Sequence, residues 1–139
     1  LLVGLLVTIL ALFFTQLHIT NIWVLLAIVP MTTILFSLAG FTNALFAKTF
    51  DDISLVPTFV LTPLTYLGGV FYSIHLLPSF WQYLSLFNPI LYIVNSFRYS
   101  ILGVTDIPVL LALMIIFFSC VGLFFINLYL LNRGKGIRT

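Results

Sequence analysis

The chain has 139 residues, of which 63% are hydrophobic and only 6% are charged, and its mean hydropathy is +1.29. Soluble domains carry roughly 25% charged residues, so this composition excludes a water-soluble fold and predicts an all-α integral membrane protein. The net charge of +2 is divided among short clusters, and without a sizeable basic patch we expect no nucleic-acid binding.

Four apolar segments are predicted to cross the membrane, because a hydrocarbon core of about 30 Å needs about 20 helical residues. They cover residues 1–14, 22–46, 57–74 and 108–131. The first segment has neither a charged leader nor a cleavage motif, so it does not resemble a signal peptide. We expect it to be a helix entered part-way, in the C-terminal portion of a longer protein.

Small residues recur at helical spacing in the second segment, at Thr33, Ser37, Gly40 and Ala44. Such a face lets helices approach each other closely in lipid. Packing within the chain is the favoured interpretation. A subunit interface or the wall of a transport path is the alternative.

The loop after the second segment carries Lys48, Asp51 and Asp52, and further basic residues lie in the tail at residues 133–139. Short basic loops favour the cytoplasmic side, so we expect the loop and the C-terminus there. We interpret the loop charges as solvated or helix-start charges. A contact with a cytoplasmic partner is the alternative.

The third segment is expected to be a pliable, partly polar helix that lines a transport path. Pro63 frees a backbone carbonyl group, and the Gly68-Gly69 pair adds a second soft point. Hydroxyl groups at membrane depth often bond only their own helix, so a bundle helix without a transport role is the alternative. The candidate path-lining residues are Thr62, Pro63, Thr65, Tyr66, Gly68 and Gly69.

The stretch at residues 76–103 is predicted to form a re-entrant or interfacial helical hairpin on the outer side. A single span here would put the basic loop and the basic tail on opposite sides of the membrane. Pro89 would break its helix in the middle, and Arg98 would lie in hydrocarbon at a cost of about 2.5 kcal/mol or more. We expect short helices at 78–87 and 89–102, with Asn88 as cap and Pro89 at the first helical position. The candidate hairpin residues are Asn88, Pro89, Tyr92, Asn95, Arg98 and Tyr99.

Arg98 is expected to anchor to lipid headgroups or to pair within the hairpin, and guiding a substrate at the outer exit is the alternative. Tyr92 and Tyr99 suit the membrane interface, where amphipathic rings are enriched. Asp106 precedes the last segment and is interpreted as its N-cap.

No motif predicts catalysis or a cofactor. Cys120 is the single cysteine and lies in an apolar run, so it is interpreted as a packing side chain. Gly134-Lys135 lacks the preceding glycine and the following Ser or Thr of a phosphate-binding loop. We expect no enzymatic activity, no cofactor and no metal in this chain.

Four motifs resemble the ABC-2 type export permeases, the membrane subunits of ATP-binding-cassette exporters. They are PLTYLGGVFY at residues 63–72, LPSFWQ at 77–82, NPILY at 88–92 and RYSILG at 98–103. The likeness covers nearly the whole chain and is least distinctive in the first helix. It implies a multi-pass permease of a bacterial inner membrane that exports a polysaccharide, a lipid-linked compound or a drug-like cargo.

The resemblance also implies partners. Family members are longer, pair as homodimers or as two half-transporters, and work with cytoplasmic ATPase subunits that hydrolyse ATP. The family's main coupling loop is expected to be missing here, and residues 48–52 match only a shorter cytoplasmic loop. A secondary transporter or passive channel without an ATPase, or an assembly subunit that moves nothing, is the alternative.

Overall fold

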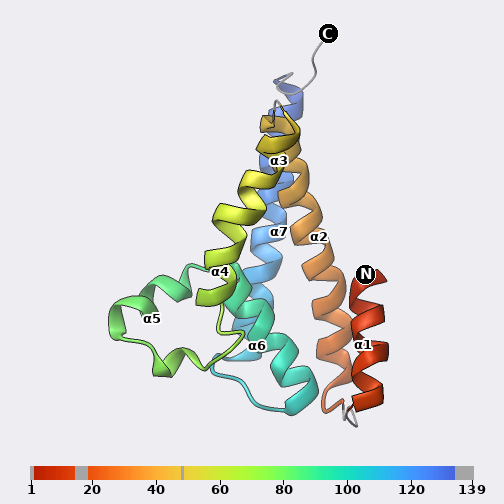
Figure 1. The fold of residues 1–139 in the computed structure, drawn as a ribbon, viewed down its shortest axis with the longest axis vertical. Coiled ribbons are helices and arrows are strands. Elements are labelled where there is room, and N and C mark those ends of the chain that lie inside the picture. The colour runs from red at the N-terminus through yellow and green to blue at the C-terminus, as the bar shows by residue number, and fades with distance from the viewer. Residues whose placement is uncertain (1, 15–18, 48, 134–139) are drawn as a thin grey trace.

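The structure is a computed structural model that describes residues 2–14, 19–47 and 49–133, and its regular elements in these ranges are all helices (Figure 1). The predicted all-α class is confirmed. Two of the described helices, α2 and α7, are long and apolar enough to cross a membrane. The elements are α1 (Leu2–Phe14), α2 (Ile22–Phe46), α3 (Phe50–Val56), the π-helical turn η1 (Pro57–Leu61), α4 (Thr62–Leu67), the 3-10 turn η2 (Ile74–Leu76), α5 (Ser79–Leu86), α6 (Pro89–Leu102) and α7 (Val109–Asn132).

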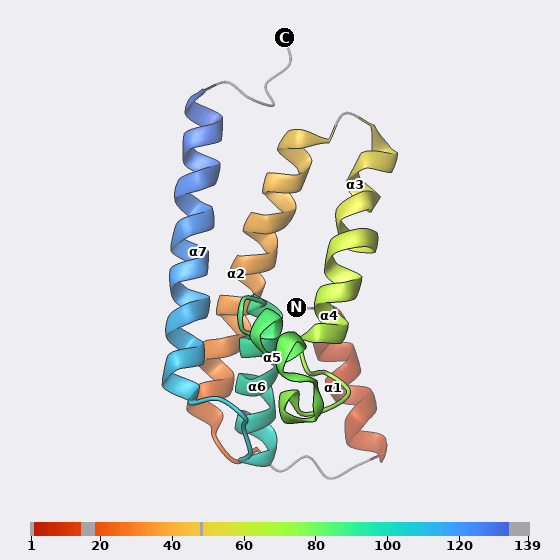
Figure 2. The same ribbon diagram turned by 90° about the vertical axis from the view of Figure 1, so that its left-hand side faces the viewer.

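The helices α2 and α7 lie side by side and run in the same direction (Figures 1 and 2). We call the end of the bundle where they finish and α3 begins the Arg133 end. The opposite end, where α2 begins and α6 finishes, is the Gly103 end. The predicted short helices at 78–87 and 89–102 correspond closely to α5 and α6 and are confirmed.

The helix α6 packs against both α2 and α7 and completes the core. Ile28 on α2, Leu91 on α6 and Ile116 on α7 are fully buried. Large side chains elsewhere on the long helices, such as Trp23 and Phe118, point outward. Since most of this apolar surface is not covered by the chain itself, it suits contact with hydrocarbon.

The small-residue face of α2 does not pack within the chain, so the favoured interpretation is wrong for most of it. Ser37, Gly40 and Ala44 are exposed, and a Cβ atom added to Gly40 would meet nothing within 4 Å. The physical reason is that α6 and α7 contact another face of α2, the one that carries Ile28 and Leu35.

A buried polar link joins α2 to α7 in the half of the bundle at the Arg133 end. The Thr42 hydroxyl donates to Asn127 Oδ1 at 2.8 Å, and Asn127 Nδ2 donates to the carbonyl oxygen of Leu38 at 3.0 Å. Asn127 is only 4% exposed. An amide in an otherwise apolar seam fixes the register of the two helices, because any slip leaves its polar atoms unpaired.

Replacing Asn127 with leucine is expected to destabilise the bundle by about 1–2 kcal/mol, because hydrogen bonds between membrane helices contribute ~0.6–1.7 kcal/mol each. The free energy of unfolding would be measured by SDS titration of the full protein in mixed micelles. Thr42→Val is the matched control, since it removes only one of the two bonds and should cost less. A larger loss in the control would contradict the assignment.

The segment from Phe50 to Leu67 is one continuous helical arm that changes its winding at Pro57. The structure therefore begins this helix earlier than the predicted span at 57–74. A capping box explains the start, because the Thr49 hydroxyl accepts from the Asp52 N–H and Asp52 Oδ2 accepts from the Thr49 N–H.

Proline explains the change of winding in the arm. Pro57 has no N–H to bond the carbonyl oxygen of Ile53, one helical turn earlier. That oxygen accepts instead from Asn43 Nδ2 on α2, at 2.9 Å. The chain then makes the wider π turn η1, in which the hydroxyl of Thr62 donates to the carbonyl oxygen of Pro57 at 3.2 Å. The hydrogen bond from Asn43 to Ile53 therefore attaches this end of the arm to α2.

Candidate functional site at the junction of α4 and α6

The helix α4 ends at Gly68, and the predicted continuation to residue 74 is wrong. Gly68 is the C-cap and its N–H donates to the carbonyl oxygen of Thr65 at 3.2 Å. Gly69 has φ +71, a left-handed conformation that favours glycine. A Cβ atom on Gly68 would lie 2.7 Å from Ile90 Cγ2. The two glycines therefore end the helix and allow it to touch α6, rather than softening a longer helix.

Asn88 joins the end of α4 to the start of α6. Its side-chain Oδ1 accepts from the Ile90 N–H at 3.0 Å, while its Nδ2 donates to the carbonyl oxygen of Leu64. Pro89 occupies the first helical position. The predicted cap geometry of Asn88 and Pro89 is confirmed. The second bond, to a carbonyl group of the other helix, was not predicted.

Replacing Asn88 with alanine is expected to cost about 2 kcal/mol of unfolding free energy, because it removes a cap worth ~1 kcal/mol and leaves the Leu64 carbonyl group unpaired. Asn88→Ser is the control, since serine keeps the cap acceptor and loses only the bond to Leu64. Thermal unfolding of the full protein in detergent would rank wild type above the serine variant and the serine variant above alanine. A serine variant as stable as wild type would contradict a role for the second bond, and equal losses in the two variants would contradict a role for the cap.

Arg98 pairs inside the protein, but both of its partners lie outside the predicted hairpin at 76–103, so the expected pairing within the hairpin is wrong. Its Nη2 donates to the carbonyl oxygen of Gly69 at 2.7 Å, and its Nη1 lies 3.3 Å from Asp106 Oδ2. Asn95, only 1% exposed, accepts the Asp106 N–H through Oδ1 at 2.9 Å. We call Gly69, Asn95, Arg98 and Asp106 the Arg98 clasp. It connects the end of α4, the helix α6 and the loop before α7.

Asp106 is not the N-cap of the last helix, so that interpretation is wrong. The helix α7 begins after Pro108, which makes no side-chain cap bond. The hydroxyl of Thr105 donates to the carbonyl oxygen of Ile107 and accepts the Ile107 N–H. This local turn positions the Asp106 carboxylate for Arg98. The signal in the sequence was two isolated opposite charges in an apolar stretch, which are expected to pair at membrane depth.

The aromatic residues of the predicted hairpin differ in their surroundings. Tyr92 is buried and its hydroxyl donates to the carbonyl oxygen of Leu86 at 2.6 Å, so its ring packs inside the protein. Tyr99 is half-buried. Trp81 and Tyr83 on α5 are exposed, and α5 projects from the side of the bundle (Figure 1).

The polar residues of α4 mostly bond their own helix. Thr65 donates its hydroxyl to the carbonyl oxygen of Leu61 at 2.8 Å, and Thr62 bonds within η1 as described above. Pro63 and Tyr66 are exposed. The carbonyl oxygen of Tyr66 accepts from the Tyr72 hydroxyl at 2.7 Å. Tyr72 is a third side chain, missed by the sequence prediction, that satisfies a carbonyl group at the end of α4.

The charged residues near the Arg133 end lie apart from this junction. Asp51 and Asp52 are in the first turn of α3, not in a loop, which agrees with the helix-start interpretation. Acidic residues in a first turn also suit the helix dipole. Lys48 lies outside the described residues, as do Lys135 and Arg138 in the tail.

The depth of the junction follows from the two ends of α6. The Asn21 N–H donates to the carbonyl oxygen of Ser100 at 2.9 Å, so α6 ends level with the start of α2. The 14 residues of α6 extend about 21 Å, and the 25 residues of α2 about 37 Å. The start of α6 and the end of α4 therefore lie near the middle of α2, as Figure 2 shows.

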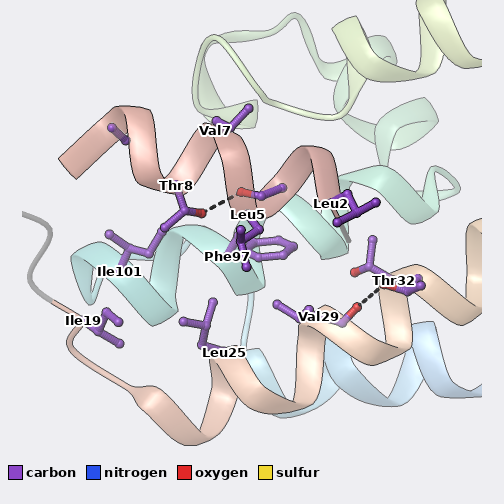
Figure 3. Close-up of a pocket in the computed structure, with 13 residues that line it drawn as sticks. Leu2, Leu5, Val7, Thr8, Ile19, Leu25, Val29, Thr32, Phe97 and Ile101 are labelled. Carbon is purple, nitrogen blue, oxygen red and sulfur yellow. Dashed lines mark hydrogen bonds between the residues drawn. The ribbon is translucent and has the colours of Figure 1, made fainter. Parts of the chain in front are cut away.

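A separate cavity of about 790 Å³ lies between α1, α2 and α6 (Figure 3). Its walls are largely apolar and include Leu5, Val29 and Phe97. The hydroxyl of Thr8 bonds its own helix, and Thr32 Oγ1 is buried without a partner among the described residues. None of the candidate path-lining or hairpin residues lines this cavity.

The fold and the junction define a helical membrane protein whose third helical segment is interrupted and fastened by polar side chains. Residues 1–102 match the family model of the ABC-2 type transporter. The chain therefore belongs to the ABC-2 type transporter family.

The chain is similar to inner membrane transport permease YadH of Escherichia coli strain K12, with 53% identity over 138 residues. The same identity is found for the proteins of that name from Escherichia coli O157:H7 and Shigella flexneri. Each match covers 99% of this chain but 54% of the relative, so the chain spans about half the length of these curated relatives. No solved structure matches it.

Proposed function

We propose that the chain forms part of the translocation path of an ATP-driven exporter in a bacterial inner membrane. The observation that carries the proposal is the family match over residues 1–102, together with 53% identity to relatives named as inner membrane transport permeases. ATP is hydrolysed by separate cytoplasmic subunits, and the cargo is a polysaccharide, a lipid-linked compound or a drug-like molecule.

Four crossings and one re-entrant hairpin give the topology that we propose. The helices α1, α2 and α7 account for three crossings, and the arm together with the irregular chain up to η2 accounts for the fourth. The helices α5 and α6 make the hairpin. The Arg133 end faces the cytoplasm, because its loop and tail carry Lys48, Arg133, Lys135 and Arg138. The Gly103 end then faces outward. Because α6 starts in the middle of the bundle and ends at the Gly103 end, its position supports a hairpin that enters from the outer side and returns to it.

The arm is the proposed wall of the path. Thr62, Pro63 and Tyr66 are exposed on it, and it is attached to the rest of the chain near its ends, through Asn43 and Asn88. A helix held in this way can change position between two states. A second permease copy is proposed to face it across the path, and Lys48, Asp51 and Asp52 to contact an ATPase subunit.

Gentle purification of the full-length protein from native membranes tests the proposal. We expect an ATP-binding-cassette ATPase to copurify in equal number, measured by native mass spectrometry. Export into inside-out vesicles should stop when the ATPase carries a substitution of its phosphate-binding lysine. Cargo movement that continues with this inactive ATPase would support a secondary transporter or channel instead. Reproducible purification of the permease without an ATPase would contradict the ATP-driven mechanism.

A further inference from the structure

We infer that water reaches the junction of α4 and α6 from the outer side of the membrane, down to the turn at Gly69. We call the irregular segment at residues 68–78 the α4–α6 break. The inference rests on the orientation given under the proposed function. Water at this turn lets small polar solutes approach the outer half of the arm.

The first support is the depth of the break. The Gly69 Cβ position lies 3.5 Å from Leu91 Cδ1, which places the turn beside the third residue of α6. From there to Leu102 is about 16 Å at 1.5 Å per residue. Since a hydrocarbon core is about 30 Å thick, the break lies well within it rather than at its surface.

The second support is the exposure of two residues, 70 and 71, in the irregular segment. The chain leaves the helix at Gly68 and regains a regular turn only at η2. Val70 is 41% and Phe71 is 71% exposed between these points. Irregular backbone at membrane depth is tolerated only where protein buries it or where it lines water. The chain buries Gly68, Gly69 and Ile74 but leaves residues 70 and 71 open.

The third support is the charge at the same place. The Arg98 and Asp106 side chains keep 22% and 18% of their surface exposed. A guanidinium group left partly open to hydrocarbon is costly even when paired, whereas water at its open side removes that cost. Arg98 also donates to the carbonyl oxygen of Gly69, so the charged pair and the irregular backbone share one environment.

Cysteine accessibility tests the inference in the full-length protein, in right-side-out membrane vesicles. The background is Cys120→Ala, and the reporter is Phe71→Cys, with Val70→Cys as a second reporter should the first fail to fold. The probe is a membrane-impermeant charged maleimide. Cysteine reacts as its thiolate, which forms in water and is disfavoured in apolar surroundings. Met114→Cys, an outward-facing position on α7, is the matched control.

We expect a reporter at 70 or 71 to react from outside at least tenfold faster than the Met114→Cys control. Reporters that are as unreactive as the control, yet react after SDS denaturation, would overturn the inference. So would reaction from the cytoplasmic side alone, or an oxidative cross-link between two reporters in place of labelling, which would mean that a second copy covers the break. The labelling needs no ATPase, so it tests water access to the break separately from ATP-driven export.

Discussion

Replacing Arg98 with alanine is expected to give one of the two largest losses of stability in this chain, about 2–4 kcal/mol of unfolding free energy. The change removes the bond to the Gly69 carbonyl group and the ion pair with Asp106. Hydrogen bonds to charged groups contribute ~1.5–3 kcal/mol each. It also leaves the carboxylate of Asp106 partly buried without its partner, which is costly in addition.

A double-mutant cycle with Asp106→Ala separates the pair from the bond to Gly69. We expect the double variant to lose less than the sum of the two single variants, because the second substitution removes the unpaired charge. Arg98→Lys should recover only part of the loss, since an ammonium group cannot reach two acceptors in the geometry of a planar guanidinium. Additive losses in SDS-titration unfolding would refute the pairing of Arg98 with Asp106.

Replacing Gly68 with alanine is expected to destabilise the protein by about 1–3 kcal/mol through overpacking. The new Cβ atom would lie 2.7 Å from Ile90 Cγ2 and 3.1 Å from the carbonyl oxygen of Leu64. Ile90 is buried and Leu64 contributes a backbone atom, so α4 and α6 must separate. The separation also weakens the bond from Asn88, and export by the full transporter should fall with stability.

Gly122→Ala is the matched control, because a Cβ atom there meets nothing within 4 Å. Glycine in a helix interior costs roughly 0.5–1 kcal/mol relative to alanine, so this variant should be neutral or slightly stabilised. The two variants would be compared by thermal unfolding in detergent and by transport in vesicles. A Gly68→Ala protein as stable as the control would show that α4 and α6 do not approach this closely in the membrane.

Helix boundaries that have a local physical cause were predicted well from the sequence. The bounds of α2 follow from an apolar run, and those of α6 from Asn88, Pro89 and the glycine at 103. Gly103 has φ +73 and closes α6 as a left-handed C-cap. In each case the residue that decides the boundary is adjacent to it in the chain.

The end of α4 was not predicted because only part of its cause is local. The apolar pattern continues past Gly68, and the Gly68-Gly69 pair was interpreted as a soft point rather than as a helix end. The partners that satisfy the carbonyl groups of Leu64 and Gly69 are Asn88 and Arg98, which lie on α6. A tertiary hydrogen bond of this kind replaces helical bonds without leaving a periodic signal.

The role of Asp106 was missed for a related reason. An acidic residue before a proline and an apolar run is typical of a helix start. The competing effect is charge pairing, since an arginine at membrane depth stabilises a carboxylate more than a helix N-terminus does. Here both a helix N-terminus and an arginine are available to the Asp106 carboxylate, and the arginine determines where the carboxylate lies.

The attachments of the arm have a consequence for how the sequence can diverge. Asn43, Asn88 and Arg98 all donate to backbone carbonyl groups of the arm and its terminal turn, never to its side chains. Every amino acid supplies such a carbonyl group, so substitutions along the arm keep these three bonds. Homologues that carry different cargo are therefore expected to vary freely at exposed arm positions such as Thr62 and Tyr66, while the three donors remain unchanged.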